Sequence, residues 1–254
     1  MYSGVVKLGI SKATASNANI FKLGLVTGPF IGFAACFAMT VEGACQGIQC
    51  LNPGLSKLIY SMIFPMGMLM TTITGGELFT GNTLTTTTAW IEGKIKLIDL
   101  LKSWTISYVS NLLGSVLFAA LVMKADILPR YSLPLSIAYA KVALPFDVVF
   151  IRSVLCNWLV SMAVYMSSGC LSMTGKAIAI WFPICAFVYI GLEHSVANMF
   201  LIPFGMMSGA DITVSQFLMK NLVPVTLGNL VGAILFVITP YATSFGTWLQ
   251  KHKR

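Results

Sequence analysis

The sequence predicts an all-α membrane protein with six transmembrane helices, arranged as an inverted three-plus-three repeat whose second and fifth helices are interrupted. Three observations lead to this fold class: the composition, the long apolar runs and a pair of repeated motifs. Of the 254 residues, 57% are hydrophobic and only 9% are charged, and the mean hydropathy is +0.84. So little polar surface cannot coat a soluble domain of this size. The apolar runs recur along the chain, unlike the single run of a signal peptide.

The net charge of +8 comes from sixteen Lys and Arg that are scattered between apolar runs. They do not gather with aromatic residues on one face, so the pattern argues against a nucleic-acid partner and favours a role in membrane topology. The six cysteines show no CxxC motif and no pairing with histidines, so no metal, redox chemistry or cofactor is predicted. A disulfide is conceivable only between Cys45 and Cys50, in the polar stretch GACQGIQC.

A helix that spans a membrane needs about 20 apolar residues, and the sequence offers six runs: about 22–42, 57–91, 103–124, 147–171, 177–209 and 221–245. The second and fifth are too long, because roughly 33 to 35 helical residues would span about 50 Å. Glycines and prolines interrupt both: Pro65, Gly75, Gly76, Gly81, Pro183, Gly191, Pro203 and Gly205. We therefore predict broken helices rather than long tilted ones. Irregular backbone at membrane depth persists only where protein buries it or water lines it, so the breaks imply a cavity or pathway.

Both long runs carry the motif Gly-x-Glu-x-x-x-x-Asn, as GGELFTGN at 75–82 and GLEHSVAN at 191–198. The third and sixth runs repeat in the same way, as NLLGSVLF at 111–118 and NLVGAILF at 229–236. The chain is therefore predicted to be one transmembrane domain (1–254) of two repeats, about 1–125 and 140–250. Because each repeat has an odd number of spans, the two have opposite orientations and their broken helices meet near the midplane.

Loop charges predict the orientation. Ten cations fall on the side that carries both termini: Lys7, Lys12, Lys22, Lys94, Lys96, Lys102, Lys176, Lys251, Lys253 and Arg254. The other side has fewer cations and carries Glu42, Asp126, Asp147 and Asp211. The positive-inside rule then places both termini in the cytoplasm, in a plasma membrane or a bacterial inner membrane.

Three ionisable side chains fall at the breaks: Glu77, Glu193 and His194. Such groups are costly inside a membrane and by default indicate function. A carboxylate at a helix break can accept backbone N–H bonds that the break leaves unsatisfied. We therefore assign a loop-structuring role to both glutamates, in preference to substrate contact, and the same role to Asn82 and Asn198.

His194 differs from the glutamates because the matching position in the first half is the apolar Leu78. The ordinary pKa of histidine lies near neutrality and suits proton exchange, so we favour a role for His194 in a substrate pathway. Thr80, beside the other break, is the expected hydroxyl partner of His194.

Large apolar residues also gather near both breaks. Phe79 and Met199 are interpreted as core packing. Lys12 and Lys141 bracket the region from opposite sides, and a positive vestibule at both mouths is what an anion pathway needs. Four further residues would form a narrow dry constriction that a hydrated ion cannot cross: Phe64, Met68, Leu78 and Phe187.

Four stretches occur together and in order: GGELFTGN (75–82), LCNWLV (155–160), GLEHSVANM (191–199) and VTLGNLVGA (225–233). With them the sequence resembles the formate/nitrite transporter family along nearly its whole length. The resemblance implies a homopentamer with a pore in every protomer and an aquaporin-like six-helix fold. Members of this family carry small monovalent anions or their acids: formate, nitrite, acetate, lactate or hydrosulfide.

The resemblance also implies roles for single residues. Thr80 matches the threonine of the interrupted second helix, and His194 matches the central pore histidine. Lys12 and Lys141 match the vestibule lysines. The constriction positions of the family fall on Phe64, Met68, Leu78, Val160 and Phe187.

The predicted function is therefore that of a channel-like transporter, not an enzyme, for small monocarboxylates or similar weak-acid anions, linked to protons. Which anion is carried stays open, since LCNWLV resembles bacterial nitrite-type members and residues 81–107 resemble protozoan members. Two alternatives remain. A haem-holding redox subunit would need two membrane histidines, and the second histidine, His252, lies in the terminal tail. A water or glycerol pore would have no use for charged vestibules.

Overall fold

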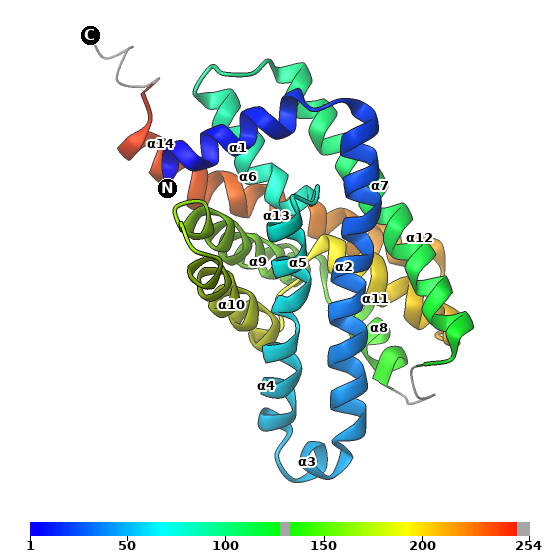
Figure 1. Cartoon of the computed structure of the whole chain (residues 1–254). Helices are drawn as coiled ribbons and strands as arrows, with labels where there is room; N and C mark the ends of the chain where they lie inside the picture. The colour runs from blue at the N-terminus through cyan, green and yellow to red at the C-terminus, as the bar shows by residue number, and fades with distance from the viewer. Residues whose placement is uncertain (128–132, 248–254) are drawn as a thin grey trace.

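The computed structural model describes residues 1–127 and 133–247. Within these ranges every regular element is a helix (Figure 1). The tail residues Lys251, His252, Lys253 and Arg254 lie outside the described residues. The first half contains α1 (Tyr2–Thr14), α2 (Asn17–Ala44), α3 (Gln46–Leu51), α4 (Pro53–Ile63), α5 (Pro65–Thr74), α6 (Phe79–Ile91) and α7 (Leu97–Ala125). The second half contains α8 (Leu133–Ala143), α9 (Phe146–Ser167), α10 (Met173–Ile190), α11 (Ser195–Met207), α12 (Val214–Gln216), η1 (Phe217–Leu222), α13 (Val223–Ala233), η2 (Ile234–Ile238) and α14 (Thr239–Phe245).

In the part of the chain that the structure describes, the helices are consistent with the predicted six spans. Five helical stretches are long and apolar enough to cross a membrane, and a sixth span results if Pro53–Thr74 and Phe79–Ile91 count as one helix with a 45° bend. The protein is thus a multi-pass membrane protein. Exposed apolar side chains such as Leu117, Leu121 and Phe182 form the kind of surface that faces lipid.

Both predicted breaks are present, and a glycine begins each one. Gly75 ends α5 with φ 77°, and Gly191 ends α10 with φ 86°. Glycine adopts this left-handed conformation without a Cβ penalty, which is why it terminates helices. In both breaks the next residue closes the helix in the same way: the N–H of Gly76 donates to Thr71 O at 2.8 Å, and the N–H of Leu192 donates to Phe187 O at 3.0 Å.

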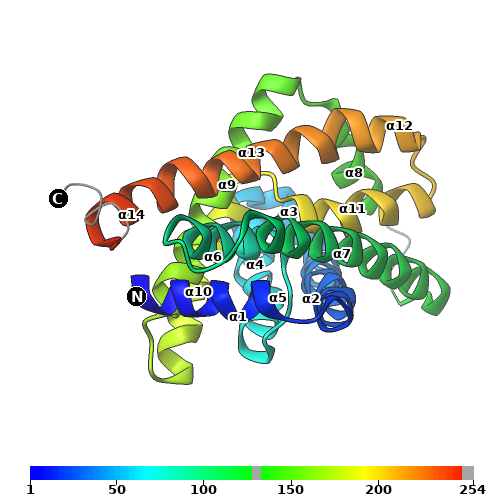
Figure 2. The same cartoon turned by 90° about the horizontal axis from the view of Figure 1, so that it is seen from above.

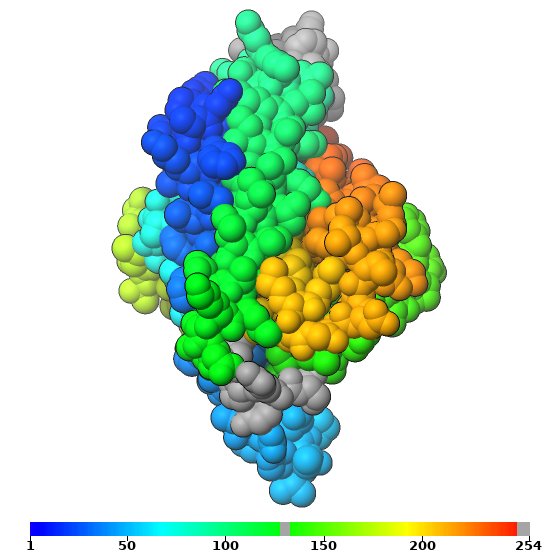
Figure 3. Space-filling model, turned by 90° about the vertical axis from the view of Figure 1, so that its right-hand side faces the viewer, coloured from blue at the N-terminus to red at the C-terminus, as the bar shows by residue number. Residues whose placement is uncertain are grey.

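Matching helix pairs form the scaffold of the two halves. Helix α2 packs along α7, and α11 packs against both; Figure 3 shows α7 between α2 and α11 on one face of the molecule. Helix α9 packs along α13 in the second half. Both pairs approach closely at glycines: a Cβ at Gly28 of α2 would collide with Ser115 of α7, and one at Gly232 of α13 would collide with Val154 of α9. Small residues at helix interfaces are how membrane helices bring their backbones into contact.

The last span contains two π-helical segments, η1 and η2, that the sequence pattern did not predict. Each is followed closely by a proline, Pro224 after η1 and Pro240 after η2. Proline cannot donate a helical hydrogen bond, and its ring clashes with the carbonyl four residues earlier. Widening the preceding turn to i→i+5 bonds is one way in which a helix accommodates this defect.

The two ends of the described chain meet at Glu92, which follows α6. The hydroxyl of Tyr2 donates to Glu92 Oε1 at 2.8 Å, and the N–H of Thr247 donates to the same oxygen at 3.1 Å. Figure 2 shows α1 and α14 near the same end of the molecule. Cys45 and Cys50 are not joined in a disulfide.

Candidate functional site

The two break glutamates are each paired with a lysine from a short helix. Lys12 in the last turn of α1 lies 3.2 Å from Glu77, and Lys141 in the last turn of α8 lies 3.1 Å from both carboxylate oxygens of Glu193. The glutamate side chains are only 4% exposed. Burial lowers the pKa of the Lys12 ammonium, and the Glu77 carboxylate opposes this shift. Each half therefore places an ion pair beside its own break, and the two lysines come from α1 and α8, on opposite sides of the breaks in Figure 1.

Asparagines complete both ion pairs. Asn82 donates to Glu77 Oε2 at 2.7 Å, and Asn198 donates to Glu193 Oε2 at 2.6 Å. The second cluster has one more amide, Asn221, which accepts from Asn198 at 2.7 Å and donates to the carbonyl of Lys141 at 2.9 Å. We name these groups the first cluster (Lys12, Glu77, Asn82) and the second cluster (Lys141, Glu193, Asn198, Asn221).

The loop backbone is held by other residues than the sequence predicted. Among the described residues, the carboxylates of Glu77 and Glu193 accept bonds from lysine and asparagine side chains, and not from backbone N–H groups of the breaks. A buried carboxylate is better compensated by a full positive charge than by a peptide dipole, which explains this choice of partner. In the first break, the lysine that pairs with Glu77 contacts the loop backbone in place of the glutamate: Lys12 donates to the carbonyl of Gly76 at 2.9 Å.

Asn111 and Asn229 bind the break backbone directly. Asn111 of α7 accepts from the N–H of Phe79 at 2.9 Å and donates to the carbonyl of Glu77 at 2.8 Å. Asn229 of α13 accepts from the N–H of Ser195 at 2.9 Å and donates to the carbonyl of Glu193 at 3.0 Å. Sequence reasoning missed this role, although the signal was present: each asparagine is the first residue of the repeated NLLGSVLF and NLVGAILF stretches.

His194 and Thr80 meet as predicted, with Nε2 2.9 Å from Thr80 Oγ1. His194 is also the N-cap of α11, because its Nδ1 accepts from the N–H of Ala197 at 3.1 Å. A neutral imidazole has one donor and one acceptor nitrogen. Since Nδ1 accepts, Nε2 carries the hydrogen and donates to Thr80. Both ring nitrogens of His194 are thus occupied by protein partners, which leaves neither free to ligate a haem iron.

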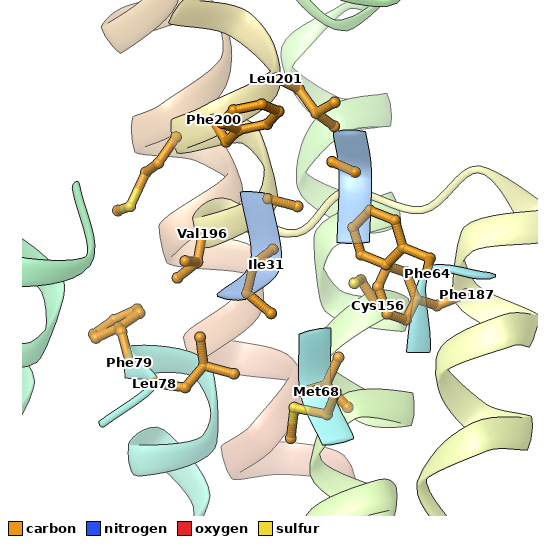
Figure 4. Close-up of a cluster of buried hydrophobic side chains, with 14 of the residues drawn as sticks. Ile31, Phe64, Met68, Leu78, Phe79, Cys156, Phe187, Val196, Phe200 and Leu201 are labelled. Atoms are coloured by element: carbon orange, nitrogen blue, oxygen red, sulfur yellow. The ribbon is translucent and has the colours of Figure 1, made fainter. Parts of the chain in front are cut away.

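An apolar constriction lies next to His194. Its cavity measures only about 10 Å³, which is at the lower limit of the room that one water molecule needs. The ring of Phe187 lies edge-on to Phe64, with centroids 6.1 Å apart, and nearly parallel to the His194 ring at 5.8 Å. The lining contains all five residues predicted for the constriction, Phe64, Met68, Leu78, Val160 and Phe187, together with Ile31 and Ile184, which were not predicted. Figure 4 shows most of this group.

A wider vestibule of about 430 Å³ opens on one side of this constriction. Phe64, Phe187 and His194 line both spaces, so the vestibule leads directly to the narrow point. Lys141 and Glu193 of the second cluster also line it. The structure therefore brings Lys141, the constriction and His194 together along one path.

Phe79 and Met199 are buried packing residues, as interpreted from the sequence. The ring of Phe79 contacts Tyr108, with centroids 4.9 Å apart, and Met199 is fully buried. Neither residue lines the vestibule or the constriction.

Comparisons of the sequence and of the structure with known proteins point to the same family of transporters. The family model described as "Formate/nitrite transporter" matches residues 1–243. A probable formate transporter of Methanothermobacter thermautotrophicus is 38% identical, with 91% of this chain and 90% of the relative covered. The formate channel FocA of Haemophilus influenzae is 34% identical, with 85% of this chain and 83% of the relative covered.

Among solved structures, an "FNT family ion channel" has a TM-score of 0.87 at 27% identity, covering 96% of this chain and 99% of that one. A "pentameric formate channel with formate bound" has a TM-score of 0.79 at 30% identity, covering 90% and 97%.

Proposed function

The chain belongs to the formate/nitrite transporter family, a family of transporters and not of enzymes, and from this membership we propose that it conducts small monovalent weak-acid anions across the membrane. Formate is the first candidate because relatives over most of the chain are formate channels or transporters by name. Acetate, lactate, nitrite and hydrosulfide are the further candidates. The observation that carries the proposal is the apolar constriction beside the His194–Thr80 pair, at the end of an open vestibule.

We further propose that transport is linked to protons. A small anion would lose its hydration shell in a passage of this size, and an isolated charge in an apolar interior costs several kcal/mol or more. A carboxylate in that position can instead take up a proton and pass as the neutral acid. The constriction residues Phe64 and Phe187 are each 4% exposed, which supports a dry passage. The proton comes from water in the vestibule, and the overall step joins one formate anion and one proton to give formic acid.

The role that we assign to His194 is to orient the permeating species, and not to donate the proton. Its Nδ1 is committed to the N–H of Ala197, so a second proton on the ring would break the cap of α11. The N-terminus of a helix also carries positive partial charge, which disfavours a cationic side chain there. Nε2–H is donated to Thr80 in the empty passage, and its bond is redirected to the permeating species as that species passes, so that the ring provides a polar step in an otherwise apolar passage.

The decisive experiment is a substrate panel in proteoliposomes that contain the purified protein. Formate, nitrite, acetate and lactate are applied at matched gradients, and uptake, internal pH and membrane current are recorded together. Proton-linked transport predicts acidification of the lumen with little net current. A current of one charge per formate molecule, with no proton movement, would contradict the proton link. Rapid glycerol entry without formate uptake would refute the anion function itself.

Assembly and orientation are part of the same proposal. We propose a homopentamer, supported by the likeness to a pentameric formate channel, and native mass determination in mild detergent tests it. We propose that both termini lie in the cytoplasm: the meeting of Tyr2 and Thr247 at Glu92 supports a shared side, and the distribution of loop cations supports the cytoplasmic one. A membrane-impermeant thiol reagent added to intact cells should then label the native Cys50, which is exposed, and not a Lys94→Cys substitution. Labelling of the substituted residue alone would reverse the orientation.

A further inference from the structure

The charges that line the vestibule are not equivalent. Five charged residues face this space: Glu42, Lys57, Lys141, Arg152 and Glu193. Lys141 is bound to both oxygens of Glu193 at 3.1 Å, so these two charges largely cancel at any distance greater than their separation. An anion that enters the vestibule is therefore attracted mainly by the cations that have no carboxylate partner.

Lys57 and Arg152 are the two cations that form no such close ion pair. Among the described residues, neither lies within 4 Å of a carboxylate. Glu42 interacts with Lys57 only at a longer distance, and the bond of Glu42 is to the hydroxyl of Ser56 at 3.4 Å. The two come from different halves of the chain, Lys57 from α4 and Arg152 from α9. Their charges exceed that of Glu42 by one, which makes the vestibule a weakly positive space.

Lys57 lies close to the break that leads to His194. Its ammonium is 3.7 Å from the place where a Cβ of Gly191 would stand and 5.6 Å from the centre of the Tyr189 ring. Gly191 begins the irregular segment that continues through Glu193 to His194. The cation thus lies beside the start of the irregular segment and lines the vestibule, but it does not line the constriction itself.

We propose that Arg152 and Lys57 form an outer anion-binding site in the vestibule, and that Arg152 gives this site a preference for planar oxyanions. This inference rests on the proposed anion transport and adds a binding step before the constriction. A guanidinium presents two parallel N–H donors that match the two oxygens of a carboxylate or of nitrite. The lysine ammonium is a point charge and attracts any anion equally well. Together they distinguish formate or nitrite from a spherical ion of the same charge.

Two structural roles compete with this assignment. Lys57 could serve only to compensate the negative end of the α10 dipole, near Gly191. Arg152 could serve only to extend towards lipid headgroups while its stem covers apolar surface. Both roles predict effects on folding or assembly, but neither predicts a change in the choice between anions.

The test compares Arg152→Gln, Arg152→Lys and Lys57→Gln with the wild type in proteoliposomes, with formate added on the vestibule side. Lys220→Gln is the matched control, because Lys220 lies on η1 and does not line the vestibule. Nitrite and bromide serve as competing anions of equal charge and different shape. The readouts are the formate concentration at half-maximal uptake, the maximal rate, and the ratio of the two inhibition constants.

We expect Arg152→Gln to raise the half-saturating concentration by roughly three- to tenfold with the maximal rate nearly kept, as loss of one charge-assisted contact would do. Arg152→Lys should keep bromide inhibition but lose much of the preference for nitrite. Lys57→Gln should weaken both competitors equally, and Lys220→Gln should change neither.

An Arg152→Lys variant with the nitrite preference of the wild type would overturn the assignment, as would an Arg152→Gln variant that lowers only the maximal rate. If Arg152→Gln fails to assemble, Arg152→Lys and Lys57→Gln still decide the question, since both keep a polar side chain in place. Absence of formate uptake by the wild type would instead be a failure of the proposed function. The two failures are thus separate results of one experiment.

Discussion

The first and second clusters share one plan, and the breaks beside them differ in the residue that follows the glutamate. In both halves a lysine and an asparagine surround a buried glutamate, and an asparagine from a neighbouring helix holds the loop. The residue that follows the glutamate is the N-cap of the next helix. In the first half this is Leu78, which makes no side-chain cap and lines the constriction; in the second half it is His194, which caps α11 and meets Thr80.

This comparison teaches that the scaffold of the break does not depend on the cap residue. The ion pair and the asparagine clamp shape both loops, so the cap position is free to become apolar in one half and polar in the other. A symmetric pair of breaks can in this way produce a pathway with one wall of leucine and one of histidine. The following predictions test the shared scaffold first and the divergent position afterwards.

The largest effect is expected when a cluster loses its carboxylate. Glu193→Ala would leave the half-buried Lys141 without its carboxylate partner and would remove the acceptor of two asparagines, Asn198 and Asn221. Removal of one partner of a buried ion pair typically costs about 3–5 kcal/mol in the free energy of unfolding. Glu77→Ala should cost less, because Glu77 accepts from only one asparagine. Equilibrium unfolding in detergent micelles measures both, with Glu193→Gln as the control that keeps the amide contacts. An equal loss in Glu77→Ala and Glu193→Ala would show that Asn221 adds nothing to the second cluster.

A smaller effect is expected from the asparagine clamps. Asn111→Ala and Asn229→Ala each remove three hydrogen bonds, two of them to the backbone of a break. A buried group left unsatisfied costs about 1–3 kcal/mol. Because the two clamps are equivalent in geometry, the two substitutions should lower the free energy of unfolding by similar amounts in the same assay. A much larger loss for one of them would contradict the equivalence.

The divergent position should affect transport more than stability. Thr80→Val removes the partner of His194 Nε2 but keeps the shape of the side chain and the cap at Nδ1. We expect it to cost about 1 kcal/mol of stability and to change the relative uptake of formate and acetate in proteoliposomes. His194→Leu makes the second break resemble the first and also removes the cap, so it should abolish selective uptake. Uptake ratios in Thr80→Val that match those of the wild type would contradict the polar step that we assign to His194.

The smallest effect concerns the dependence on salt. Attraction by exposed charges is screened over about 8 Å at physiological ionic strength. Uptake of formate at low concentration should therefore fall with added salt, and Lys57→Gln should weaken this dependence. The double substitution of Lys141→Gln with Glu193→Gln should leave the salt dependence unchanged, because it removes both charges of a balanced pair. Initial rates over a series of inert salt concentrations measure the slopes. A slope that disappears in this double variant would assign the attraction to the paired lysine instead.

Much of the fold was predictable because the membrane imposes simple rules on sequence. The spans were predicted from the length of the apolar runs. The breaks were predicted because two of these runs are too long for one span and contain Gly75 and Gly191. The constriction and the His194–Thr80 contact were predictable from large apolar residues and from motif matches. The partner of each lysine was not, because the pairing of α1 with the first break and of α8 with the second is a tertiary arrangement.

The unpaired vestibule cations could not be recognised for a similar reason. Lys57 and Arg152 lie near the ends of apolar runs, where single basic residues are common in membrane proteins. Only the packing of α4, α9 and α10 around one cavity separates them from ordinary loop charges. Likewise, the sequence shows Asn111 and Asn229 only as the first residues of two repeated helical stretches. Their contact with the break backbone depends on the tertiary structure.

The π-helical segment η1 has a consequence for how the two similar halves can differ in length. From break glutamate to clamp asparagine, the first half has 34 residues (111 − 77) and the second has 36 (229 − 193). An insertion inside a regular helix would rotate all later side chains by about 100° per residue, and would turn Asn229 away from the loop that it holds. A turn with i→i+5 bonds encloses one extra residue and absorbs an insertion locally. One of the two extra residues lies in the loop 208–213, which has six residues where the loop 92–96 has five, and the other lies between the start of the helix and the asparagine. Because η1 lies within this helical interval, it is the place where the second half accommodates one residue more while Asn229 stays in register with its loop, and an alignment of the two halves should open a one-residue gap there.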